Sequence, residues 1–204
     1  MMKKVKKVTD TIFLVLIILL TFSSCNKPDI KSVVIPEALY QVLEDGDIIC
    51  RLGNGVFSQY ISDVSVSDKR FSHMGIIRIN DGLITVINAE GDTGHGRDFV
   101  CEITIEEFLK DAVSAGVYRV NNINRSLISG LAMEYIGIPF DWQFDLIDES
   151  KIYCTELLQI ILKRITPGLV LDTVYFNIAG KDIIPLEAIS ASPLFSEVYF
   201  TELK

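Results

Sequence analysis

The sequence of 204 residues predicts an α+β fold in which helices pack against a mainly antiparallel sheet. Two apolar runs at 74–79 and 83–89 flank Asn80-Asp81-Gly82, and an Asp-Gly pair between such runs is a strong signal for a β-hairpin. Helices are indicated at 126–136 and directly after Cys154. Strands and helices do not alternate in the regular order of a parallel βαβ sheet, which favours the α+β class.

The chain before the hairpin is predicted to contain a short helix and a strand. Residues 36–43 favour a helix, because Pro36 suits its first turn. Glu44-Asp45-Gly46 ends it, and 47–52 is a strand-forming run. Residues 53–70 are polar and contain glycine and serine, which predicts a long loop or a short helix.

The chain after the hairpin is predicted to begin with a loop. Residues 90–97 contain three glycines, which is typical of a loop. Thr104 and Glu107 form a capping box for a helix that runs to about Ala115. The remaining elements are a strand at 117–120, a helix at 126–136 stopped by Gly137, and short apolar strands or edges at 176–186 and 193–200.

The first 24 residues have the composition of an export signal. Four lysines precede an apolar run at 12–20, which is too short to span a membrane. Small residues then lead to Cys25, an order that resembles the lipobox of bacterial lipoproteins, although Phe22 stands where an aliphatic residue is more usual. The resemblance implies a signal peptide at 1–24, a tether at 25–35 that is lipidated on Cys25, a single domain at 36–204, and a place in the bacterial cell envelope. A plain secretory peptide and an uncleaved anchor are the alternatives.

The net charge of the mature chain narrows the classes of partner that it can bind. Without the four lysines and one aspartate of the signal, 15 basic and 26 acidic residues remain, a net charge near −11. This balance argues against nucleic acid and against electrostatic adhesion to anionic lipids as partners.

Beyond Cys25, three cysteines remain (Cys50, Cys101 and Cys154), so at least one thiol is unpaired. A Cys50–Cys101 disulfide and three free thiols are both open.

Cys154 is the first candidate for chemistry. A cysteine at a helix start meets unpaired backbone N–H groups and the positive end of the helix dipole, which favour a thiolate. His73, one of two histidines, stands at the start of the first hairpin strand. The pair suggests a thiol hydrolase, against the alternative that Cys154 is an inert packing residue.

The hairpin register supplies a third group for the histidine. With Asp81-Gly82 as the turn, cross-strand partners have numbers that sum to 163, so His73 lies opposite Glu90 and Asn88 lies diagonal to it on the same face. A side-chain oxygen on the far ring nitrogen orients a catalytic imidazole, and both residues can supply one. The alternative is that Asn88 only ends a strand and Glu90 only begins a solvated loop.

An ordered set of motifs resembles a known family. The motifs are Gly46-Asp47-Ile48-Ile49, Ser72-His73-Met74-Gly75-Ile76-Ile77, Val86-Ile87-Asn88-Ala89 and Tyr153-Cys154-Thr155-Glu156-Leu157-Leu158. Over about residues 46–195 the chain resembles the YiiX/YaeF-like branch of the NlpC superfamily, circularly permuted papain-like cysteine hydrolases. The resemblance implies that Cys154 is the nucleophile and His73 the general base. The branch often has Glu where this chain has Asn88, and we favour Asn88 over Glu90 as the orienting residue.

The predicted function is that of a lipid-anchored envelope hydrolase, which cleaves an amide or ester bond through a thioester on Cys154 and needs no cofactor. The resemblance implies peptide, muropeptide or N-acyl amide substrates; the alternative is a non-catalytic lipoprotein that binds an amphipathic ligand or a partner. No G-x-S-x-G motif is present, and the loop at 91–98 lacks the spacing of a metal site. Phe140, Trp142 and Phe144 are predicted to line a substrate groove or, for at least two of them, to pack in the core.

Overall fold

The computed structural model describes residues 33–92 and 96–203. The predicted signal peptide, Cys25 and most of the predicted tether lie outside the described residues. Residues 33–204 form one compact unit that contains all described strand pairings and three clusters of buried apolar side chains. This part of the chain therefore has a complete core of its own.

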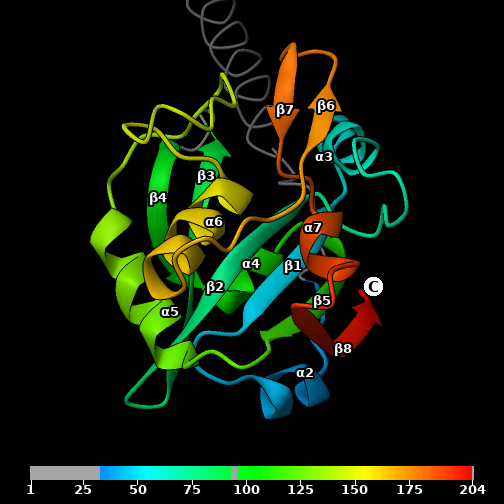
Figure 1. Ribbon diagram of the computed structural model, residues 1–204. Coiled ribbons are helices and arrows are strands. Elements are labelled where there is room, and N and C mark those ends of the chain that lie inside the picture. Colours follow the sequence, from blue (N-terminus) through cyan, green and yellow to red (C-terminus); the bar gives the residue numbers. More distant parts are fainter. Residues whose placement is uncertain (1–32, 93–95, 204) are drawn as a thin grey trace, which may run out of the picture. The chain divides into compact units, whose positions relative to one another are not determined.

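A six-stranded sheet forms the centre of this unit, with strand order β4-β3-β2-β1-β5-β8 (Figure 1). All of its pairings are antiparallel, which confirms the predicted sheet and the α+β class. A separate hairpin of two short strands, β6 and β7, projects beside helix α3 (Figure 1). The strands are β1 (Ile48–Gly53), β2 (His73–Asn80), β3 (Leu83–Asp92), β4 (Arg97–Thr104), β5 (Ala112–Val120), β6 (Val174–Phe176), β7 (Lys181–Ile183) and β8 (Phe195–Glu202).

Short helices cover both faces of the sheet. They are α2 (Glu37–Val42), α3 (Val56–Ser62), α4 (Ile105–Leu109), α5 (Arg125–Ala132) with a 3₁₀ turn at Met133–Tyr135, α6 (Cys154–Ile165) and α7 (Glu187–Ser190). Among the helices of the described ranges, none is long and apolar enough to cross a membrane.

Alternating side chains of the strands divide the core between the two faces. On β1, Ile48 and Cys50 belong to the cluster that includes α5 and α6, whereas Ile49 belongs to the cluster with α2 and α4. Nine consecutive residues of α6, from Cys154 to Leu162, are buried. Helix α6 is therefore a core helix, and its first residue is held at a fixed place against the sheet.

The hairpin of β2 and β3 has the predicted register. Pairs run from Asn80↔Leu83 to Ile76↔Ile87, so that each pair of numbers sums to 163. Asp81 and Gly82 both have positive φ, 49° and 81°, as a two-residue type I′ turn requires. The turn thus sets which face of the sheet receives the side chains of His73 and Asn88.

The region from 90 to 115 differs from the prediction in two ways. The predicted loop at 90–97 is partly strand, because β3 continues to Asp92 and pairs with β4 from Asp92↔Arg97 to Thr85↔Thr104. The predicted helix begins as expected, with Thr104 Oγ1 accepting a hydrogen bond from the Glu107 N–H at 3.2 Å, but it ends at Leu109. Strand β5 follows because β1 and β8 pair with it on both sides, and this long-range pairing overrides the local helix signal.

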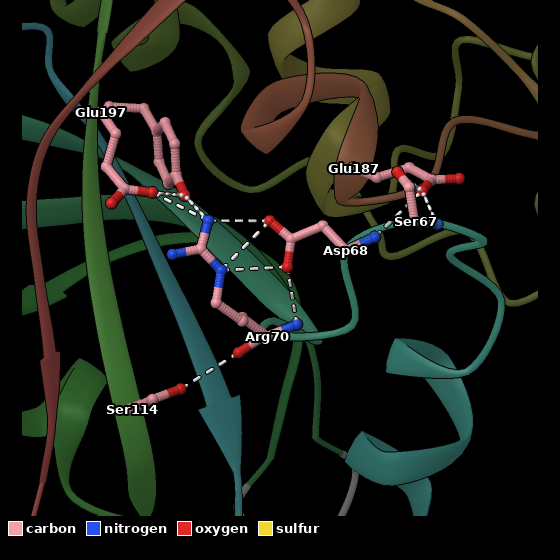
Figure 2. Close-up of polar contacts among 7 residues, drawn as sticks. Ser67, Asp68, Arg70, Ser114, Glu187 and Glu197 are labelled. Carbon is pink, nitrogen blue, oxygen red and sulfur yellow. Dashed lines mark hydrogen bonds and ion pairs between the residues drawn. The ribbon is translucent and has the colours of Figure 1, made fainter.

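The segment between α3 and β2 is fixed at two points (Figure 2). The Glu187 carboxylate in α7 accepts hydrogen bonds from the N–H and the hydroxyl of Ser67, both at 2.6 Å. The Arg70 guanidinium pairs with Asp68 at 2.9 Å and with Glu197 in β8 at 2.8 Å. These contacts tie the segment between α3 and β2 to the C-terminal elements of the domain.

Candidate active site

Cys154 is the first residue of α6, as predicted, and the residue is only 8% exposed. The preceding Tyr153 N–H donates to Glu156 Oε2 at 3.2 Å, which caps the helix start. The Tyr153 hydroxyl accepts from the Ile184 N–H at 3.0 Å, and the Thr155 hydroxyl donates to the Ile184 carbonyl at 2.7 Å. The first turn of α6 is therefore fixed on both sides of the thiol.

His73 is the first residue of β2, and its ring is fixed by a hydrogen bond to one nitrogen and by stacking on one face. Nε2 lies 2.9 Å from Asn88 Oδ1, and the ring stacks on Phe108 of α4 with 5.5 Å between centroids. Because the amide oxygen only accepts hydrogen bonds, Nε2 carries the ring proton. Nδ1 is then the nitrogen with a lone pair that can take a proton.

Asn88 is fixed in turn by the residues behind it. Its Nδ2 donates to Cys101 Sγ at 3.8 Å, which directs Oδ1 toward His73. The Cys101 thiol donates to Glu90 Oε2 at 3.9 Å, and Glu90 forms an ion pair with Arg97 at 2.7 Å. Of the two predicted candidates, the structure therefore places Asn88 on the imidazole and Glu90 on Arg97.

Gly75 creates the space that Asn88 needs. A Cβ at Gly75 would lie 2.3 Å from Val86 Cγ1 and 3.2 Å from Asn88 Cβ. Any larger residue would push the neighbouring strand and with it the amide that faces His73. Gly75 therefore keeps this part of the hairpin uncrowded.

Cys154 and His73 line one pocket with a volume of about 240 Å³. The backbone N–H of Met74, the residue after His73, forms a hydrogen bond with the Cys154 thiol. Within the described residues, no hydrogen bond joins the thiol to the imidazole directly. Transfer of a proton between them requires the two side chains to approach as substrate binds, as often occurs in ligand-free sites.

The resting thiol is neutral, which corrects the expectation of a thiolate at this helix start. Burial raises the pKa of Cys154 to about 11, although the backbone N–H groups of Met74, Thr155 and Cys154 and the charge of Arg51 lower it. The helix start thus acts in the predicted direction. The lost hydration of a buried thiolate is the larger effect.

The resting imidazole is neutral as well. The pKa of His73 is lowered to about 3: burial is the largest cause and the charge of Arg51 also lowers it, whereas the hydrogen bond to Asn88 raises it. A neutral base beside a neutral thiol suits attack in which the proton leaves sulfur as the new bond forms.

Arg51 is a site residue that the sequence reasoning missed. It pairs directly with His73 in the β1–β2 register, lines the pocket, and lies over the Phe108 ring at 5.3 Å. Arg51 lies two residues after Ile49, so both side chains are on the same face of β1. Once β1 is placed beside β2, this position puts Arg51 on the face of the sheet that carries His73. Sequence alone does not show which strands become neighbours.

Most of the pocket wall is apolar. Phe140 and Phe144 line the pocket and also pack against buried clusters, so that both predicted roles apply to them. Trp142 is 44% exposed and lies outside the lining. The remaining apolar lining residues are Phe57, Ile61, Val64, Tyr153, Ile183, Ile184, Pro185 and Leu186.

The described cysteines are not bridged. Cys50, Cys101 and Cys154 are free and buried. In the described ranges, no three His, Cys, Asp or Glu side chains gather into a group able to hold a metal ion. The centre of the loop at 91–98, residues 93–95, lies outside the described residues.

Comparisons with known proteins agree with this site. A family model described as "Permuted papain-like amidase enzyme, YaeF/YiiX, C92 family" matches residues 42–169, and no curated protein matches the chain. One similar solved structure is titled "Crystal structure of metalloprotein yiiX from Escherichia coli O157:H7". It has a TM-score of 0.64 at 15% identity, with 79% of this chain and 99% of that chain covered, a likeness that shows the fold. Because the family model spans more than half of the sequence, the chain belongs to the permuted papain-like cysteine amidases of the YaeF/YiiX family.

Proposed function

We propose that this protein is a lipid-anchored cysteine hydrolase of the cell envelope that removes an acyl group from an amide or ester. The observation that carries the proposal is the shared pocket, in which the Cys154 thiol and the His73 imidazole meet an apolar wall. Membership of a papain-like amidase family supports the reaction type. Placement in the wider NlpC superfamily is part of the same proposal.

The proposed reaction uses the two neutral groups in sequence. Cys154 Sγ attacks the carbonyl carbon as its proton passes to His73 Nδ1, and the oxyanion faces the backbone N–H groups at the start of α6. The tetrahedral species collapses, the carbon–nitrogen or carbon–oxygen bond breaks, and the leaving group takes the proton from His73. Water then gives a proton to His73 and attacks the thioester, which releases the carboxylic acid and restores the thiol.

Asn88 has the role of a positioning residue in this reaction. Its Oδ1 accepts a hydrogen bond from the Nε2–H, which keeps Nδ1 unprotonated and fixes the orientation of the ring. Since Asn88 bears no charge, it orients the base without greatly stabilising an imidazolium.

The pocket lining favours an acyl group over a charged muropeptide. Arg51 and Glu90 are the charged residues among the described lining residues, and the deeper wall is formed by aromatic and aliphatic side chains. Contact with such a wall removes an acyl chain from water, which is favourable. The several carboxylates of a muropeptide would lose their hydration there without cations to pair with, which is unfavourable.

The nucleophile and base are tested by substitution. Cys154→Ala and His73→Ala are expected to abolish hydrolysis of an N-acyl amino acid while the circular dichroism spectrum and melting temperature stay close to wild type. Cys50→Ala, a buried cysteine outside the pocket lining, is the matched control and keeps its activity. Residual activity of Cys154→Ala above roughly 1% of wild type would contradict the proposed covalent mechanism, because loss of a nucleophile costs several powers of ten.

The substrate class is tested with a series of acyl lengths. Each added methylene that enters the pocket is expected to raise kcat/KM by up to about fourfold, the equivalent of about 0.8 kcal/mol. Muropeptides that are cleaved faster than every acyl amide would contradict the acyl assignment and leave the cysteine mechanism standing.

A further inference from the structure

Six aromatic side chains beside the pocket contact one another in a continuous series, which we name the aromatic collar. Its members come from three separate segments: α3, the loop after Gly137, and the β6–β7 hairpin. They are Phe57, Tyr60, Phe140, Trp142, Phe144 and Phe176. The centroid distances along the series are 6.3 Å for Phe57–Trp142, 4.9 Å for Trp142–Phe140, 6.3 Å for Phe140–Phe144, 5.7 Å for Phe144–Phe176 and 5.9 Å for Phe176–Tyr60.

The collar connects the pocket to the surface of the molecule. Phe57, Phe140 and Phe144 line the pocket that holds Cys154. On the outer side, Phe57 is 55% exposed, Trp142 44% and Tyr60 39%. Phe57 therefore both lines the pocket and faces solvent, and Trp142 contacts it from outside the lining.

The exposed apolar surface extends beyond the collar on two sides. Val56, next to Phe57 in the chain, is 89% exposed. Ile178, at the turn of the β6–β7 hairpin, is 69% exposed and shares a shallow hollow with Trp142 and Phe176. We call the collar together with Val56 and Ile178 the apolar mouth.

Charge is scarce at the apolar mouth. Helix α3 contains no charged residue, and neither does the hairpin stretch 175–180, although 23% of the whole chain is charged. Lys181, which borders the hollow, is paired with Asp145 at 2.8 Å. Asp98 also contacts the collar, but its carboxylate accepts a hydrogen bond from Trp142 Nε1. The surface therefore offers little to a partner recognised through ion pairs.

We propose that the apolar mouth docks on the surface of a lipid bilayer, where Phe57, Val56 and Ile178 enter the acyl region and an acyl substrate passes through the collar to Cys154. Tyrosine and tryptophan with one polar tip suit this boundary, and Trp142 Nε1 already donates to Asp98 at 2.6 Å. An apolar, uncharged surface beside an apolar pocket is more stable in contact with lipid than in contact with water.

The predicted tether brings the domain within reach of such a surface. Seven residues separate the proposed lipidation site, Cys25, from Val33, where the described domain begins. Eight extended steps span at most about 29 Å, which is less than the diameter of a domain of this size. The docking proposal rests on the proposed anchor for this proximity, but it does not depend on turnover.

The test uses the domain of residues 33–204 and vesicles of zwitterionic phosphatidylcholine. Trp142 is the single tryptophan of the chain, so its fluorescence reports on the collar alone. We expect its emission to shift to shorter wavelength on addition of vesicles and to be quenched by lipids brominated on the acyl chain. The binding should survive 0.5 M salt, because the contact is apolar and not electrostatic.

Matched substitutions locate the contact. Phe57→Ser and Val56→Ser are each expected to weaken vesicle binding, by about tenfold for the aromatic ring. Leu83→Ser removes an equally exposed leucine, 62% exposed, at the β2–β3 turn on the far end of the sheet from α3, and should leave binding unchanged (Figure 1). Circular dichroism melts confirm that each variant is folded.

Three outcomes would overturn docking by the apolar mouth: no change in Trp142 emission, binding that is lost in 0.5 M salt, or equal weakening by Phe57→Ser and Leu83→Ser. Because the measurement involves no catalysis, Cys154→Ala should bind vesicles like wild type even if the proposed hydrolase activity is wrong. Conversely, an active enzyme with no affinity for vesicles would refute only the docking surface.

Discussion

The imidazole of His73 is fixed by contacts with three residues, and each affects its chemistry differently. Asn88 holds Nε2 at 2.9 Å and thereby selects the tautomer. Phe108 covers one face of the ring, and the charge of Arg51, its cross-strand partner, disfavours protonation. The result is a base that stays neutral until a proton is released from the nearby thiol.

Substitution of Asn88 and of Glu90 should have unequal effects. Asn88→Ala is expected to lower kcat by about 10- to 1,000-fold with little change in KM, because it disturbs the orientation of the base and spares substrate binding. Glu90→Gln is expected to change kcat by only a few-fold, since Glu90 faces Arg97 and reaches Asn88 only through Cys101. Steady-state kinetics of both variants provide the measurement, and a severe loss in Glu90→Gln with a mild one in Asn88→Ala would reverse the assignment.

The neutral state of Cys154 predicts a steep pH dependence of alkylation. With the pKa of the thiol raised to about 11 by burial, only a small thiolate fraction exists at pH 7. The rate of reaction with iodoacetamide should therefore rise about tenfold per pH unit from pH 7 to 10. Mass spectrometry of the Cys154 peptide measures this rate, and Cys154→Ala gives the background from Cys50 and Cys101. A rate that is already maximal at pH 7 would show a resting thiolate instead.

At the scale of elements, the first turn of α6 contains a buried carboxyl group with an unusual charge state. Glu156 is 2% exposed, and burial raises its pKa to about 8. The Tyr153 N–H lowers the pKa, whereas the carboxylates of Asp141, Glu149 and Asp145 raise it. The helix that presents Cys154 therefore begins with a carboxylic acid that is mostly protonated at neutral pH.

Glu156→Gln should change how stability depends on pH. The folded-state pKa lies above the unfolded one, so the folded protein holds the extra proton between about pH 4.5 and 8, and wild-type stability falls across this window as pH rises. One proton contributes at most about 1.4 kcal/mol per pH unit. Glutamine keeps an oxygen for the Tyr153 N–H and carries no charge, so the variant should match wild type near pH 5 and exceed it at pH 8.

Urea unfolding at pH 5, 6.5 and 8 measures this difference. Glu134→Gln, which removes an exposed carboxylate, is the control for the loss of one acidic residue. Equal pH slopes for Glu156→Gln and wild type would show that Glu156 ionises normally in the folded protein.

At the scale of the whole molecule, the proposed lipid anchor on Cys25 would determine where the pocket operates. The proposed lipidation of Cys25 predicts that Cys25→Ala loses incorporation of a fatty-acid label and that the peptidase inhibitor globomycin leaves the signal attached. Cys50→Ala should still incorporate the label. The label is the decisive measurement, because the apolar mouth alone is expected to hold some protein at the membrane. Retained label in Cys25→Ala would exclude this lipidation site.

Local signals in the sequence predicted the elements that carry the candidate site. Asp81-Gly82 permits positive φ at both turn positions, and this turn with alternating side chains sets the β2–β3 register. That register placed Asn88 and His73 on one face before any tertiary contact was known. The start of α6 at Cys154 was also predictable from a local signal, because an apolar helical run begins there.

Long-range pairing and burial decided the rest. The early start of β5 at Ala112 depends on β1 and β8, which are distant in sequence and outweigh the capping box at Thr104. The extension of β3 to Asp92 depends on its pairing with β4, which outweighs the turn signal of Gly91. Arg51 and His73 are cross-strand partners only because β1 lies beside β2.

The sequence by itself determined the residue types, their order and the hairpin geometry that brings an amide to an imidazole. Only the tertiary structure decided that the thiol and the imidazole are both neutral, since that depends on how completely neighbouring elements exclude water from them. It also decided that rings from α3, the loop after Gly137 and β6 contact one another beside one pocket. Side chains so far apart in the chain have no local signal for their contact, because the energy that joins them arises only when the complete core has formed.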